Sequence, residues 1–151
     1  MALRSYLIIA LFVFFVAMTG SDIYARMTIG GWSFGQAVNG HLEWASMTVV
    51  GIFFLFAPFL AVAFICAAVN KRARTRSAAT IFGAVVLVLL YYYFGGFQAA
   101  QQALLDKRWT AAALSVGLLP FFIGIPTVLA VVGLGALAST FDPQMSDQDA
   151  S

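Results

Sequence analysis

Residues 44–70 read WASMTVVGIFFLFAPFLAVAFICAAVN, and this stretch decides the fold of the chain. No charged residue interrupts it between Glu43 and Lys71. A helix rises ~1.5 Å per residue, so about 20 apolar residues cross the ~30 Å hydrocarbon core of a bilayer. The stretch is therefore long enough to form a membrane-spanning helix.

Three further uncharged stretches make up most of the remaining sequence. They cover residues 5–21, 77–105 and 109–141. Hydrophobic residues account for 62% of the chain and charged residues for 9%, whereas a soluble domain has ~25% charged residues. We therefore expect an all-α integral membrane protein, a single domain over residues 1–151 built as a four-transmembrane-helix bundle. The expected spans are approximately 4–21, 45–70, 77–99 and 110–138.

The first stretch also has some features of a cleaved signal peptide, since Arg4 precedes an apolar run over residues 6–18. A cleavage site needs small residues, but a cut after Gly20 would place Met18 at the third position before it. We therefore expect the first stretch to be retained as a helix.

Basic residues are concentrated between the second and third spans: Lys71, Arg72, Arg74 and Arg76. Short loops rich in Lys and Arg stay in the cytoplasm. This pattern predicts cytoplasmic N- and C-termini in a multi-pass protein of the cell membrane, which we expect to be a bacterial inner membrane. The cluster either only sets the topology or also contacts anionic lipid headgroups.

The segment between the first two spans predicts a short interfacial helix. Gly30-Gly31 indicates a turn, and Ser33 with Gln36 fits a capping box, in which each side chain satisfies a backbone N–H at a helix start. At the other end of the chain, the acidic tail over residues 142–151 has no apolar pattern and is expected to be disordered.

Few residues have the character of a catalytic or metal site. His41 and Glu43 are the only acid–base pair, and their spacing places them about 200° apart around a helix. Asp22 could add a third ligand, but no spacing places it nearby. The single Cys66 cannot form an intramolecular disulfide or a multi-thiolate site. We therefore expect no catalytic site, no metal and no cofactor, and a protein that is not an enzyme.

The third span carries polar residues along its outer half: Tyr91, Gln98, Gln101 and Gln102. Polar side chains in lipid seek hydrogen bonds on neighbouring helices. The residues form either an aromatic belt followed by an emerging helix or a polar groove for a lipid headgroup or a partner helix.

Two further features concern helix geometry. Pro120 and Pro126 predict kinks in the fourth span, because proline removes a helix hydrogen bond. Small residues four apart, such as Gly135 and Ser139, predict close helix packing within the bundle.

The composition favours an interaction protein over other classes. No charged side chain lies deep in an expected span, which argues against proton-coupled transport. A net charge of +2, scattered along the chain, does not suggest nucleic acid. We expect an accessory subunit of a larger membrane complex, with membrane lipids and another membrane protein or a homo-oligomer as partners. The alternatives are an immunity-type protein against a membrane-active toxin and a carrier of a lipid or small apolar molecule.

Overall fold

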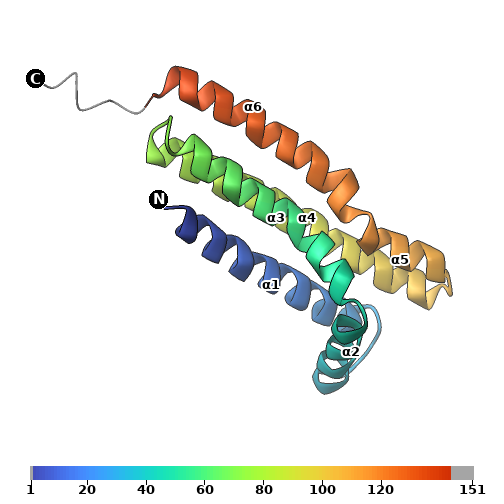
Figure 1. Cartoon of the computed structure of the whole chain (residues 1–151). Coiled ribbons are helices and arrows are strands. Elements are labelled where there is room, and N and C mark those ends of the chain that lie inside the picture. The colour runs from blue at the N-terminus through green and yellow to red at the C-terminus, as the bar shows by residue number, and fades with distance from the viewer. Residues whose placement is uncertain (1, 144–151) are drawn as a thin grey trace, which may run out of the picture.

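The computed structural model describes residues 2–143, and nearly all of them are helical (Figure 1). The elements are α1 (Leu3–Thr28), α2 (Phe34–Met47), α3 (Val49–Val69), α4 (Thr75–Leu105), α5 (Trp109–Gly117), a π-helical turn η1 (Pro120–Gly124) and α6 (Ile125–Phe141). Four helices are long and apolar enough to cross a membrane: α1, α3, α4 and the α5–α6 unit over residues 109–141. The expectation of four such helices is confirmed.

α1 continues beyond residue 21, the expected end of the first span, and this extension adds two charged residues, Asp22 and Arg26. Nε of Arg26 donates a 2.9 Å hydrogen bond to Asp22 one turn earlier, a spacing that a helix favours. The chain leaves the helix near Gly31, whose φ of 70° lies in the left-handed region that glycine adopts easily. The first long helix therefore bears a paired acid and base near its end.

α2 lies across the direction of the long helices at one end of the bundle (Figure 1). The capping box is confirmed: Ser33 Oγ accepts from the backbone N–H of Gln36, and Gln36 Oε1 accepts from that of Ser33. Ala37 and His41 are its buried residues, so its packed face is centred on them.

Aromatic residues of α1, α3 and α4 fill the core between these helices. The Phe59 ring packs edge-on against Tyr93 and against Phe14, with centroids 5.1 and 5.4 Å away. The Tyr93 hydroxyl donates a 2.6 Å hydrogen bond to the carbonyl of Leu55. This carbonyl lies in the turn before Pro58, where the missing proline N–H weakens the regular helix bonding.

The expected kink of the fourth span is a single π-helical turn. Pro120 opens it, and the N–H of Ile125 donates to the Pro120 carbonyl five residues earlier. Pro126 occupies the second position of α6, where the helix tolerates proline. The two prolines therefore bound one irregular segment, after which α6 changes direction relative to α5 (Figure 1).

The N-terminus, the α3–α4 loop and the end of α6 lie at the same end of the bundle (Figure 1). Arg74 in that loop donates from Nε to Oδ1 of Asp142 at 3.1 Å, and its backbone N–H donates to the Asp142 carbonyl. Ser77 also donates to Asp142, and Ala73 bridges to Pro143. Asp142 and Pro143 thus belong to the packed structure, in contrast to the tail expected from the sequence. The rest of that tail, residues 144–151, lies outside the described residues.

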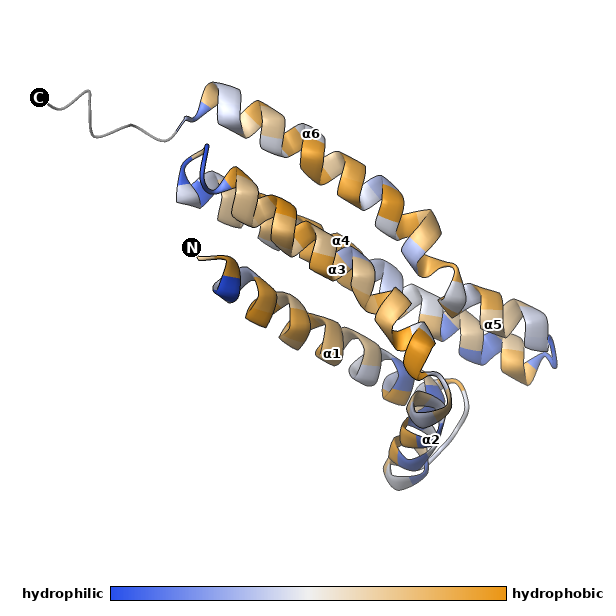
Figure 2. Ribbon diagram, viewed as in Figure 1, coloured by the Kyte–Doolittle hydropathy of each residue, from blue (hydrophilic) through white to orange (hydrophobic). Residues whose placement is uncertain are grey.

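Hydropathy follows this arrangement (Figure 2). Hydrophilic residues gather in the α3–α4 loop, in the α4–α5 loop and at the junction of α1 with α2, while apolar residues cover the lengths of the long helices.

Candidate ligand-binding cavity

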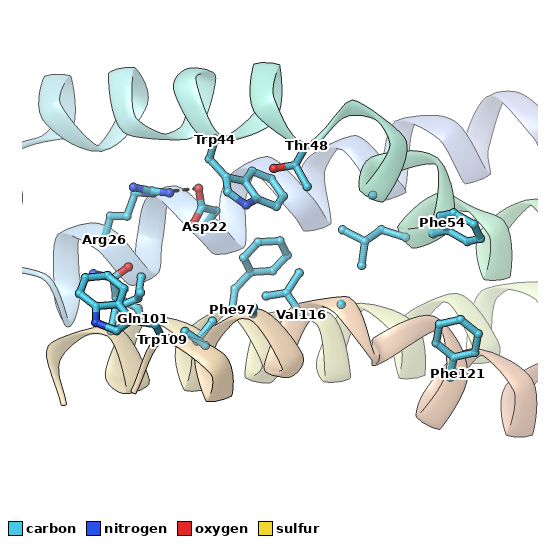
Figure 3. Close-up of a pocket in the computed structure, with 17 residues that line it drawn as sticks. Asp22, Arg26, Trp44, Thr48, Phe54, Phe97, Gln101, Trp109, Val116 and Phe121 are labelled. Atoms are coloured by element: carbon cyan, nitrogen blue, oxygen red, sulfur yellow. Dashed lines mark hydrogen bonds and ion pairs between the residues drawn. The ribbon is translucent and has the colours of Figure 1, made fainter. Parts of the chain in front are cut away.

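A cavity of about 570 Å³ lies between α1, α2 and α3 on one side and α4 and α5 on the other. Its size falls within the range of ~300–1,000 Å³ for small-molecule sites. Figure 3 shows polar residues gathered at one end and phenylalanines at the other. Its lining includes Asp22, Arg26, Phe54, Phe97, Gln101 and Phe121.

Asp22 organises the polar end. Its Oδ2 accepts two hydrogen bonds of 2.9 Å, one from Nε of Arg26 and one from Nδ1 of His41 on α2. Because an ionised carboxylate only accepts, the His41 proton lies on Nδ1. All three side chains are largely buried, so the bonds act in an environment where charge-assisted hydrogen bonds are strong. Oδ1 of Asp22 accepts no hydrogen bond from residues 2–143.

Arg26 is held in place on several sides. Its guanidinium lies 5.2 Å from the centroid of the Trp32 ring, a cation–π distance. A terminal nitrogen lies so close to Gly40 of α2 that a Cβ there would overlap it. Only Nε is used in a hydrogen bond among the described residues, so the terminal nitrogens keep donors that have no protein acceptor.

Gln101 supplies a buried amide at the same end. Its side chain is 7% exposed, and within residues 2–143 it forms no hydrogen bond. Its amide lies against Gly30 and faces the cavity near Arg26 (Figure 3).

The rest of the cavity is an apolar passage. Phe97, which packs edge-on against Trp44 at 5.7 Å, and Leu55 line its inner wall. Phe54 and Phe121 line its far end, and both are more than half exposed. The passage is therefore open to the apolar surface of the bundle between α3 and the α5–α6 unit.

The structure does not gather the expected groove residues of α4 in one place. Gln101 faces the cavity, while Tyr91 and Gln98 line a separate groove between α4 and α5. Gln102 is exposed and donates to Asp106 at 3.3 Å in the outer loop. The polar residues of α4 are separated because α5 packs along α4. Gly96 of α4 lies against the side chain of Leu119, which follows α5 in the chain.

The expected His41 and Glu43 pair is also separated. His41 is 4% exposed and bonded to Asp22, whereas Glu43 is exposed in a shallow hollow beside Trp32 and Gln36. From the sequence, no spacing places Asp22 near His41 and Glu43. The local signal for the position of Asp22 is its i, i+4 spacing to Arg26, which predicts that the two side chains pair on one helix. Among residues 2–143, no three His, Cys, Asp or Glu side chains are placed to hold a metal ion.

In the basic loop, Arg74 is engaged with Asp142. The other three basic residues, Lys71, Arg72 and Arg76, are exposed. Their contact with lipid headgroups stays a prediction.

The fold and the cavity together define a class: all-helical proteins with four helices apolar enough to cross a membrane and an amphipathic cavity between them. Comparison with protein-family models, with curated proteins and with solved structures finds no match for the chain.

Proposed function

We propose that this chain is a membrane-embedded protein that binds one single-chain amphiphile in the cavity. The polar head lies at Asp22, Arg26 and Gln101, and the hydrocarbon chain lies along Phe97 toward Phe54 and Phe121. The observation that carries the proposal is the side chain of Gln101, a residue only 7% exposed, whose amide has no hydrogen-bond partner among residues 2–143 and lines the polar end of an otherwise apolar passage. A ligand head supplies the hydrogen bonds that the protein leaves unmade.

Insertion in a bilayer is part of the proposal. The exposed surface of the long helices is rich in large apolar side chains, such as Phe12, Phe53 and Leu129. An apolar surface of this extent is stable in lipid and unfavourable in water. The basic α3–α4 loop, the N-terminus and the end of α6 share one end of the bundle, and the positive-inside rule assigns that end to the cytoplasm. The polar end of the cavity then lies near the outer surface of the membrane.

The opening between α3 and the α5–α6 unit gives the ligand its route. Phe54 and Phe121 border the opening and would face hydrocarbon in a bilayer. An amphiphile already dissolved in the outer leaflet therefore enters sideways, with its head at the level of Arg26 and without leaving the lipid phase. This places the proposed function in the carrier or binder class.

The roles of accessory subunit and immunity-type protein stay predictions from the sequence. Within the described part of the chain, no contact or surface favours a protein ligand over a lipid at the cavity.

The test is photo-crosslinking of a diazirine-bearing long-chain alcohol to the full chain in lipid nanodiscs. The proposal predicts labelling of peptides that line the passage, on α3, α4 and α5. Ala113→Phe, which places a ring in the cavity from α5, should abolish this labelling. Ala136→Phe is the matched control, because Ala136 is exposed on α6 and does not line the cavity.

Uniform labelling of all lipid-facing helices, unchanged by Ala113→Phe, would show that the alcohol contacts only the outer surface.

A further inference from the structure

We infer that the ligand head is uncharged and carries a hydroxyl group, as in a long-chain alcohol or a monoacylglycerol. The inference rests on the proposed function and adds the chemical class of the ligand. It is carried by the hydrogen-bonding groups that Asp22, Arg26 and Gln101 leave free at the polar end of the cavity.

The charges at the polar end of the cavity favour a neutral ligand head. Asp22 and Arg26 are the charged residues among those that line the cavity, and they neutralise each other through a 2.9 Å ion pair. A phosphate or carboxylate head would meet the free Oδ1 of Asp22, and an ammonium head would meet the terminal nitrogens of Arg26. Either ion would lose its hydration without a matching countercharge, which is strongly unfavourable in a buried site. The balanced pair therefore selects a neutral head.

The polar end of the cavity offers both hydrogen-bond donors and acceptors to a ligand. Arg26 and the Gln101 amide offer N–H donors, while Oδ1 of Asp22 and Oε1 of Gln101 offer acceptors. A hydroxyl group donates and accepts, so it can donate to Asp22 while it accepts from Arg26 or Gln101. An ether or ester oxygen only accepts, and it would leave the Asp22 oxygen without a donor. The mixed set therefore favours a hydroxyl over other neutral heads.

The charged side chains at the polar end are held in place by their neighbours. His41 fixes the Asp22 carboxylate from α2, and Trp32 and Gly40 confine the guanidinium of Arg26. The donors and acceptors are thus oriented before a ligand arrives, which lowers the ordering cost of binding. Donors and acceptors that are fixed in this way discriminate between ligands that have the same hydrocarbon chain but different head groups.

The experiment measures competition against the crosslinking probe by four ligands with one oleyl chain. They are oleyl alcohol, oleyl methyl ether, oleyl phosphate and oleylamine, and monooleoylglycerol forms a fifth arm. A ligand head that leaves a polar group of the cavity without a hydrogen bond binds with an affinity lower by about 10-fold or more. Oleyl alcohol is therefore expected to displace the probe at a concentration at least ~10-fold lower than the ether, the phosphate or the amine.

The fifth arm separates the two sources of the hydroxyl. Stronger competition by monooleoylglycerol than by oleyl alcohol assigns an acylglycerol, and the reverse order assigns a simple alcohol. Both orders support the hydroxyl-bearing class.

Two variants test the role of single groups. Asp22→Asn keeps the size of the side chain but leaves Arg26 without its countercharge, so the preference should move from oleyl alcohol toward oleyl phosphate. Gln101→Leu removes the unpartnered amide and should reduce the advantage of the alcohol over the ether, while thermal stability stays the same or rises. Thermal unfolding of each variant confirms that it is folded.

The outcomes separate this inference from the proposed function. Equal competition by all heads, or a preference for the phosphate or the amine in the unmodified protein, overturns the hydroxyl assignment and leaves the cavity as a lipid site. No site-specific crosslink with any probe overturns the proposed function itself.

Discussion

Nδ1 of His41 lies 2.9 Å from Oδ2 of Asp22, although the two residues are nineteen positions apart in the chain. This bond joins the crosswise helix α2 to the end of α1. It orients the carboxylate so that one oxygen serves His41 and Arg26 and the other is left for the cavity. The position of α2 and the chemistry of the cavity therefore depend on one side chain.

Replacing His41 should loosen α2 without unfolding the bundle. His41→Leu removes a buried hydrogen bond to a charged group, worth about 1.5–3 kcal/mol, while Arg26 still neutralises Asp22. Hydrogen exchange of the α2 backbone amides should become faster, and that of α3 and α4 should not change. The control is Leu42→Ala at a neighbouring exposed position. Unchanged exchange in α2 after His41→Leu would contradict the role of this bond in docking the helix.

Tyr93→Phe should lower the stability of the bundle core. The hydroxyl of Tyr93 donates a 2.6 Å hydrogen bond to the Leu55 carbonyl in the turn before Pro58. Interhelical hydrogen bonds in membrane proteins contribute about 0.6–2 kcal/mol, so a fall in thermal midpoint of a few degrees is expected. Tyr91→Phe is the matched control, since Tyr91 is 73% exposed and forms no hydrogen bond among the described residues. Equal midpoints for the two variants would show that the Tyr93 bond contributes nothing.

Two glycines of α6 should respond differently to the same substitution. A Cβ at Gly135 would overlap the side chain of Val69 on α3, whereas a Cβ at Gly133 meets open space. Gly135→Val should therefore separate α6 from α3 and lower the thermal midpoint, because a packed β-branched neighbour cannot move aside cheaply. Gly133→Val should have little effect. A larger loss of stability at Gly133 would refute this packing of α6 against α3.

Cysteine labelling can test the proposed orientation, because the native Cys66 is buried and can be replaced by Ala. A cysteine at Arg72 in the α3–α4 loop should be protected from a membrane-impermeant maleimide in intact cells. One at Lys107 in the α4–α5 loop should be labelled. Labelling of Arg72→Cys with protection of Lys107→Cys would mean that the bundle has the opposite orientation.

Much of the fold can be predicted from the sequence because its signals are local. The uncharged stretches predict the long helices, and Ser33 with Gln36 predicts the start of α2 by a contact within one turn. Pro120 predicts the irregular segment of the fourth span, but its π-helical form depends on packing that the proline alone does not specify.

The cavity could not be predicted in the same way, because it depends on contacts between distant segments. Gln101 and Gln98 look alike in the sequence, and only the path of α5 along α4 separates the cavity from the second groove. Asp22 looks like a loop residue at the edge of an apolar stretch until α1 is seen to continue to Thr28. The ion pair between Arg74 and Asp142 likewise joins two segments that are distant in the sequence, and no local pattern in either segment predicts the contact.

Native mass spectrometry of the protein released from its own membranes shows most directly whether the cavity holds an amphiphile. We expect one bound adduct per chain that survives mild activation and has the mass of an uncharged single-chain lipid. The adduct should be absent from Ala113→Phe and present in Ala136→Phe. If the unmodified chain carries no such adduct, or if Ala113→Phe carries the same one, the cavity does not bind an amphiphile.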